Sequence, residues 1–169
     1  MRIAIIGHAG SGKTYLANRI SQRFSIPHLH LDRIFLTSGG DKTNRTDEET
    51  NKVRQIMREK IQEFLKENNE WVSDGTYTRM QPMIADIADK VIYLDIPLWK
   101  RQLNHMKRIF YRKNRHREVS FLQDLYFTYD MVRRTRNSKS RVEDLTTRYK
   151  DKLTVLKSQK EVDDYINRL

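Results

Sequence analysis

The stretch GHAGSGKT, at residues 7–14, constrains this chain more than any other part of its sequence. It has the order glycine, four residues, glycine, lysine and threonine, which is the pattern of a phosphate-binding loop. The apolar run at residues 2–6 before it predicts a short buried strand, and apolar side chains after it recur at helical spacing (Leu16, Ile20, Phe24). We therefore predict a strand, a loop and a helix that together bind a nucleoside triphosphate.

Each residue type in this loop has a physical reason. Glycines permit positive φ angles and a close approach of the backbone to phosphate, and a helix that begins near Lys13 directs the positive end of its dipole at the anion. The lysine reaches the outer phosphates, and the hydroxyl of Thr14 holds Mg2+. A glycine-rich turn with an exposed lysine is the alternative interpretation. The residues that we expect to bind ATP here are Gly7, Gly10, Ser11, Gly12, Lys13, Thr14 and Tyr15.

The rest of the chain alternates predicted strands with predicted helices, which is typical of an α/β fold with a parallel sheet covered on both faces. Further strands are expected at residues 28–32, 71–73, 91–94 and 153–156. A capping box at Thr46 begins a long amphipathic helix that ends near Asn68. Further helices are expected at residues 80–88, 98–111, 121–136 and 161–169. No linker or repeat divides the 169 residues, so we expect a single domain over 1–169.

Composition narrows the class of protein. There is no cysteine, which excludes disulfides, a thiolate nucleophile and a zinc site built on cysteine. The sequence has no apolar run that approaches a membrane span or the core of a signal peptide, so we expect a cytoplasmic protein.

The positive charge is concentrated in one segment. Residues 100–141 hold thirteen Lys or Arg against three acidic residues, which accounts for +10 of the net charge of +11. Such a segment predicts an anion site, either for a polyphosphate or for a nucleic acid. Arg101 and Arg108 are seven residues apart and lie near one helical face, where arginines can neutralise phosphate charge during transfer. Arg133 is expected to join them in binding ATP.

Two aspartates follow predicted strands, where ligands of open parallel sheets gather. We expect Asp32 to bind or deprotonate an acceptor hydroxyl, and Asp74 to position Mg2+ with Thr14. Both could instead cap a helix or turn. His28 and His30 alternate with apolar residues, so we expect at least one of them to face the interior, and packing is favoured over the binding of a ligand.

Several segments resemble a known family. GHAGSGKT, IPHLHLD (26–32), WVSDGTY (71–77), DKVIYLDIP (89–97) and TVLKSQKEVDDYI (154–166) are similar to the small P-loop proteins called DNA topology modulation or FlaR-related proteins. These in turn resemble adenylate kinase and other nucleoside monophosphate kinases. The similarity runs in order over most of the chain and is weakest at residues 36–70 and 112–150.

The resemblance implies a five-stranded parallel sheet of order 2-3-1-4-5, an acceptor-binding segment at residues 36–70 and a basic lid at residues 99–141. Asp74 and Gly75 match the Asp-Gly after the third strand of adenylate kinases, where the aspartate is implied to hold Mg2+ through water. The arginine expected four residues after this aspartate is Thr78 here.

Together these features predict an ATP-dependent kinase that transfers the γ-phosphoryl group of Mg-ATP to a nucleotide, a nucleoside or another hydroxyl metabolite. Lys13, Asp32, Asp74, Arg101 and Arg108 are the expected catalytic residues. The alternative is a nucleotide-gated regulator that binds nucleic acid through the basic segment, although no DNA or RNA recognition motif is present. We expect a monomer or a homodimer.

Overall fold

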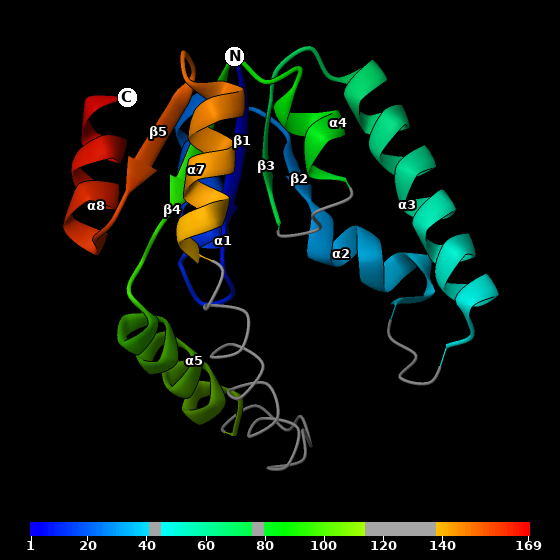
Figure 1. The fold of residues 1–169 in the computed structure, drawn as a ribbon, viewed down its shortest axis with the longest axis horizontal. Coiled ribbons are helices and arrows are strands. Elements are labelled where there is room, and N and C mark those ends of the chain that lie inside the picture. Colours follow the sequence, from blue (N-terminus) through cyan, green and yellow to red (C-terminus); the bar gives the residue numbers. More distant parts are fainter. Residues whose placement is uncertain (41–44, 76–79, 114–137) are drawn as a thin grey trace. The chain divides into compact units, whose positions relative to one another are not determined.

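The computed structural model describes residues 1–40, 45–75, 80–113 and 138–169. Its five strands form one sheet in the order β2-β3-β1-β4-β5, with flanking helices (Figure 1), which confirms the predicted fold and strand order. The strands are β1 (Arg2–Gly7), β2 (His28–His30), β3 (Trp71–Asp74), β4 (Lys90–Leu94) and β5 (Leu153–Leu156).

Most of the predicted helices are present with differences at their ends, whereas the helices at residues 31–40 and 138–149 were not predicted. The helices are α1 (Lys13–Phe24), α2 (Leu31–Phe35), α3 (Asp47–Glu67), α4 (Gln81–Ala85), α5 (Leu98–Lys113), α7 (Ser138–Tyr149) and α8 (Gln159–Arg168), and a short π-helix, η1 (Leu36–Gly40), continues α2. The helix predicted at residues 80–88 is shorter, since α4 ends at Ala85. The helix predicted at residues 121–136 lies almost wholly outside the described residues.

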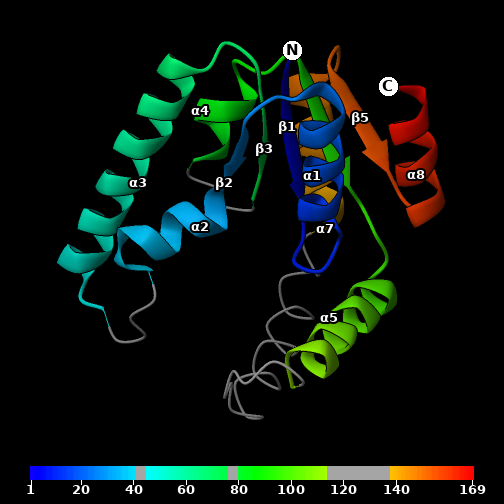
Figure 2. The same cartoon turned by 180° about the vertical axis from the view of Figure 1, so that it is seen from behind.

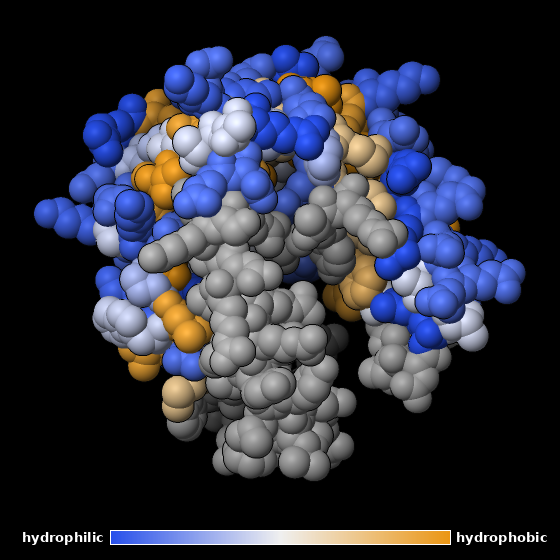
Figure 3. Space-filling model, viewed as in Figure 1, coloured by the Kyte–Doolittle hydropathy of each residue, from blue (hydrophilic) through white to orange (hydrophobic). Residues whose placement is uncertain are grey.

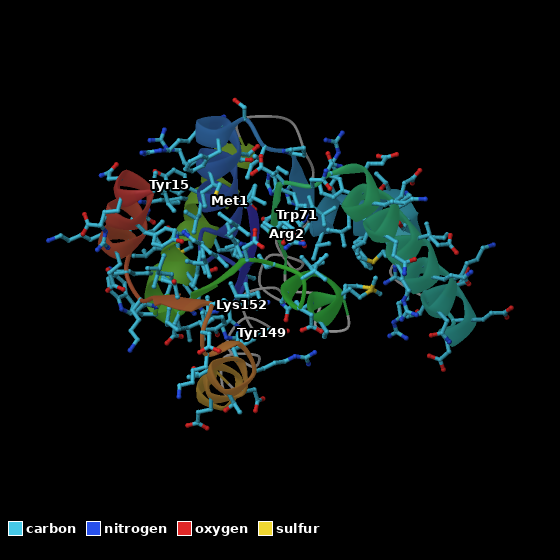
Figure 4. All side chains as sticks on the ribbon, turned by 90° about the horizontal axis from the view of Figure 1, so that it is seen from above. Met1, Arg2, Tyr15, Trp71, Tyr149 and Lys152 are labelled. Carbon is cyan, nitrogen blue, oxygen red and sulfur yellow. The ribbon has the colours of Figure 1, made fainter. Side chains whose placement is uncertain are left out.

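The chain divides into two compact units. The first contains Met1–Ile5 and Thr14–Val91, and the second contains Ile6–Lys13 and Ile92–Leu169. In the first unit β1 and β3 run parallel with Arg2 opposite Trp71, and the two residues lie close together in Figure 4. All four residues of β3 are buried, so the polar side chain of Asp74 is held inside the unit.

Helix α3 is a long helix of the first unit, and Figure 2 shows it with α2. The capping box predicted at its start is present: Glu49 N donates to Thr46 Oγ1 (3.2 Å), and Thr46 N donates to Glu49 Oε2 (2.9 Å). Residues at helical spacing form its buried stripe (Val53, Met57, Ile61). Helix α3 packs against α2 and η1. The described residues of the segment predicted to bind an acceptor, 36–70, are largely helical.

The second unit is built around β4 and β5. Asp95 N donates to Leu156 O (2.9 Å), and α7 and α8 pack on β5. At the turn between α7 and β5, Lys152 Nζ lies 5.4 Å from the centre of the Tyr149 ring, and Figure 4 shows these two side chains as neighbours.

On the face seen in Figure 3 the described side chains are mainly hydrophilic, and hydrophobic ones lie in small groups. Among the described residues, no helix combines the length and the apolar character needed to cross a membrane. Most charged side chains of the described residues are exposed or half-buried, and Lys13, Asp74 and Arg101 are buried.

Candidate functional site

The phosphate-loop motif folds as the sequence predicts, between β1 and α1. Gly10 and Gly12 have φ angles of 76° and 92°, in the left-handed region that glycine adopts at no steric cost. Ser11 N donates to His8 O (3.3 Å), and the Lys13 ammonium donates to the same carbonyl (2.8 Å). Lys13 is 8% exposed, so its charge is held at the loop rather than extended into solvent.

The start of α5 supports the loop from within the same unit. Asn104 Nδ2 donates to Gly10 O (3.0 Å). A Cβ atom placed on Gly10 would come within 2.8 Å of the Arg101 carbonyl oxygen, so this position has room only for glycine. Asn104 had no assigned role in the sequence analysis, since an asparagine inside a helix carries no motif.

The side chain of Arg101 is buried at 2% exposure, and its Nε donates to Ile96 O (3.0 Å). Burial lowers the pKa of its guanidinium, while the nearby Tyr93 and Asp95 raise it. Arg101 thus anchors the first turn of α5 beside the loop. Its predicted contact with a phosphate remains a prediction.

In the first unit Thr14 and Asp74 are joined directly. Thr14 Oγ1 lies 2.5 Å from Asp74 Oδ2, to which the hydroxyl donates, and Asp74 is 1% exposed. The two residues come from the start of α1 and the end of β3. The two residues assigned to Mg2+ from the sequence therefore lie together and share a short hydrogen bond, and their binding of Mg2+ stays a prediction.

Two histidines of β2 approach the other oxygen of this carboxylate. His28 Nε2 is 2.9 Å and His30 Nδ1 is 3.2 Å from Asp74 Oδ1. His30 is the register partner of Asp74, and His28 lies two residues earlier on the same face of the strand. The two rings stack, with centroids 5.3 Å apart.

The histidines were expected to pack rather than to bind a ligand, and the structure adds that both approach a carboxylate. Both keep some exposure, 13% for His28 and 33% for His30, and both face a carboxylate. Only His28 has the geometry of a hydrogen bond to Asp74. The parallel pairing of β2 with β3, which the resemblance implied, brings both rings to this carboxylate.

The surroundings set the charge of Asp74. Burial raises the pKa of this carboxyl, but hydrogen bonds from His28 and Thr14 and the nearby charge of His30 and His28 outweigh it, so the pKa lies below its ordinary value. Asp74 is therefore a carboxylate at neutral pH. A buried carboxylate of this kind needs partners for both of its oxygens, and here each oxygen has one.

Asp32 lies elsewhere than predicted. The strand expected to end at residue 32 ends at His30, and Asp32 is the second residue of α2, with an exposed side chain. A carboxylate in the first turn of a helix is stabilised by the helix dipole, which favours this early helix start. A role in binding an acceptor hydroxyl remains a prediction for Asp32.

Other predicted residues are described only in part. Tyr15, in the first turn of α1, is 48% exposed. Arg108 lies on α5, but its side chain is outside the described part of the chain, and Arg133 and Thr78 are outside it altogether. Most of the predicted lid at residues 99–141 falls there as well.

The residues present fit Mg2+. A hydroxyl and a carboxylate provide the hard oxygen ligands that this ion prefers, and Mg2+ takes few protein ligands because it keeps several waters. Within the described ranges there is no cluster of three or more His, Cys, Asp or Glu that could hold a metal ion. Thr14 and Asp74 would thus hold the ion together with the phosphates and water rather than in an all-protein cage.

The phosphate loop and the strand order show that this protein has a P-loop fold, the fold of many nucleotide-binding proteins. A family model described as an AAA domain matches residues 3–91, more than half of the chain, so the chain belongs to this family of P-loop proteins. This match implies nucleotide binding. It does not show the DNA topology modulation family that the sequence resembles.

Solved structures show the same fold over the whole chain. A shikimate kinase from Bacteroides thetaiotaomicron has a TM-score of 0.57 at 17% identity, with 99% of this chain and 95% of that chain covered. A shikimate kinase from Acinetobacter baumannii in complex with shikimate has a TM-score of 0.59 at 15% identity, covering 99% and 89%. A deoxyadenosine kinase from M. mycoides has a TM-score of 0.57 at 17% identity, covering 99% and 98%. No curated protein matches the sequence.

Proposed function

We propose that this protein is an ATP-dependent kinase that transfers the γ-phosphoryl group of Mg-ATP to a small hydroxyl acceptor. The observation that carries the proposal is the hydrogen bond between Thr14 and the ionised, buried Asp74. Thr14 is the last residue of the phosphate-loop motif, and the preceding Lys13 is held at the loop by its hydrogen bond to His8 O. A pair such as Thr14 and Asp74 is what phosphoryl transfer requires of a protein, namely fixed groups that place the metal and the phosphates.

The loop would bind the triphosphate through its backbone N–H groups and Lys13. Thr14 and Asp74 would hold Mg2+, which would supply positive charge to neutralise the outer phosphates. The basic residues of the segment 100–141, Arg101, Arg108 and Arg133 among them, would add positive charge around the transferred group.

The acceptor is expected to be small and to carry a hydroxyl group. Asp32 is exposed one residue beyond the buried start of α2, and a carboxylate there would accept a hydrogen bond from such a hydroxyl and orient it. The likeness in fold to kinases named for shikimate and for deoxyadenosine supports acceptors of this size. We propose a nucleoside, a nucleotide or another hydroxyl metabolite.

The test is ADP release from Mg-ATP across a panel of nucleosides, nucleoside monophosphates, small hydroxyl metabolites and duplex DNA. We expect one class of small molecule to stimulate ADP release, and Lys13→Ala to reduce that release to background. Lys13→Ala turnover equal to the wild type would contradict the mechanism. Stimulation by DNA alone, with free phosphate as the sole product, would instead support a nucleic-acid-binding regulator.

A further inference from the structure

Three hydrogen bonds form a network around Asp74 and His28 within the first unit. Thr14 Oγ1 donates to Asp74 Oδ2 (2.5 Å), His28 Nε2 meets Asp74 Oδ1 (2.9 Å), and His28 Nδ1 meets Asn18 Oδ1 (3.0 Å). Thr14 and Asn18 are one turn apart on α1 and share a face of the helix. The three hydrogen bonds therefore join α1 to β3, β3 to β2, and β2 back to α1.

The charge of Asp74 fixes the direction of the hydrogen bond between His28 and Asp74. Asp74 is ionised and can only accept, so Nε2 of His28 carries the hydrogen that lies between them. The side-chain amide of Asn18 can present either its oxygen or its nitrogen to Nδ1 of His28. It therefore holds the His28 imidazole in place whether or not Nδ1 carries a hydrogen. His28 is thus oriented from both sides of its imidazole.

We propose that His28 is a positioning residue that holds Asp74 Oδ1, so that Oδ2 stays directed at the Thr14 hydroxyl and at the metal that the pair would bind. The inference rests on the proposed function, because it assigns a supporting residue to the Mg2+ site of that kinase. A carboxylate that is hydrogen-bonded on one oxygen presents the other in one orientation, which reduces the reorganisation needed when a metal binds.

His30 is the natural comparison for His28. It lies on the same strand, stacks on the same imidazole and approaches the same oxygen at 3.2 Å, but it does not have hydrogen-bond geometry toward Asp74. It also lacks a partner like Asn18 among the hydrogen bonds of the described residues. Loss of its imidazole should therefore leave the carboxylate held by His28 and Thr14.

The test measures how much Mg2+ strengthens the binding of a non-hydrolysable ATP analogue. Calorimetry with and without Mg2+ gives a ratio of dissociation constants, the Mg2+ gain, which requires no turnover. We expect His28→Phe to reduce this gain about 10-fold or more, the usual effect of removing the hydrogen-bond partner of a metal ligand. His30→Phe should keep the gain, and His28→Gln, whose amide can still donate to Asp74, should recover part of it.

A double-mutant cycle separates positioning from a general effect on the fold. In an Asp74→Asn background the gain is already lost, so His28→Phe should change it no further. Asn18→Leu, at an exposed helix position, should give a smaller loss of gain than His28→Phe and serves if His28→Phe does not fold.

Each outcome has one meaning. Equal gains in the wild type and in folded His28→Phe, or equal losses in His28→Phe and His30→Phe, would overturn the assignment to His28. A wild-type protein that binds the analogue but gains nothing from Mg2+ would overturn it as well. A wild-type protein that binds no nucleotide would overturn the proposed function itself.

Discussion

Gly10 is a residue at which both the backbone and the surroundings demand glycine. Its φ angle of 76° strains any other residue, and an added Cβ would meet the Arg101 carbonyl oxygen at 2.8 Å. Gly12 has a similar φ of 92°, but an added Cβ there would meet nothing within 4 Å. We expect Gly10→Ala to lower the free energy of unfolding more than Gly12→Ala, which should cost only the backbone strain of about 1–3 kcal/mol.

Urea unfolding of the two alanine variants measures the difference. Because Gly12→Ala carries the same type of strain, it is the matched control for the contact with Arg101. Equal losses of stability in the two variants would show that α5 does not crowd Gly10 as described.

Asp74 should make the stability of the fold depend on pH in the acid range. Its pKa is lower in the folded state, chiefly because hydrogen bonds from His28 and Thr14 outweigh the effect of burial, so folding favours the ionised form. The resulting stabilisation is complete above the unfolded pKa of about 3.9 and is lost as pH falls through the lower pKa of the folded state. We expect Asp74→Asn to remove this part of the acid sensitivity and to cost about 1.5–3 kcal/mol at neutral pH.

Urea unfolding at a series of pH values from neutral to strongly acidic tests this expectation. The stability curves of the wild type and Asp74→Asn should converge as pH falls. If their difference is constant over the whole range, the carboxylate contributes nothing as an ion.

The sequence was sufficient for residues that belong to a motif with its own spacing. Lys13 and Thr14 follow from the loop pattern, and Asp74 from its position after a strand. The contacts of His28 and Asn18 were not predicted, because they arise only when β2 and β3 pair in register. That register places His30 opposite Asp74, and no local pattern in the sequence specifies it. The contact of Asn104 was not predicted either, because it arises only when α5 packs on the phosphate loop.

Helix α3 illustrates stability at the scale of one element. Its N-terminus is closed by the reciprocal bonds of Thr46 and Glu49, which satisfy two backbone donors that the helix itself leaves unpaired. We expect Thr46→Ala to lower the free energy of unfolding by about 1 kcal/mol. Thr46→Ser keeps the hydroxyl and should be close to the wild type in urea unfolding. A Thr46→Ala protein as stable as Thr46→Ser would mean that the capping box is not formed in solution.

The elements themselves were largely predictable. The strands at residues 71–73, 91–94 and 153–156 and the long capped helix were located to within a residue or two, since apolar runs and caps act locally. The second strand was predicted too long, because Leu31 is buried while Asp32 and Arg33 are exposed, a pattern that suits the first turn of a helix as well as an alternating strand. Tertiary pairing decided between them.

At the scale of the whole molecule, the fold is shared far more widely than the sequence. Kinases that match 99% of this chain are only 15% to 17% identical to it. A fold of this kind depends on apolar patterning and on glycines such as Gly10, whereas an acceptor is recognised by individual side chains. This separation explains why the fold and the binding of a nucleotide could be predicted from the sequence, whereas the acceptor could not.

The most direct test of the account follows the γ-phosphoryl group itself. The protein would be incubated with Mg2+ and ATP carrying 18O in the γ-phosphate, together with the small acceptor that most stimulates ADP release, and the products would be separated by mass spectrometry. The account predicts labelled phosphate on a hydroxyl of the acceptor, in amounts equal to the ADP formed and absent with Lys13→Ala. Label found only in inorganic phosphate would contradict it, because the protein would then be a hydrolase and not a kinase.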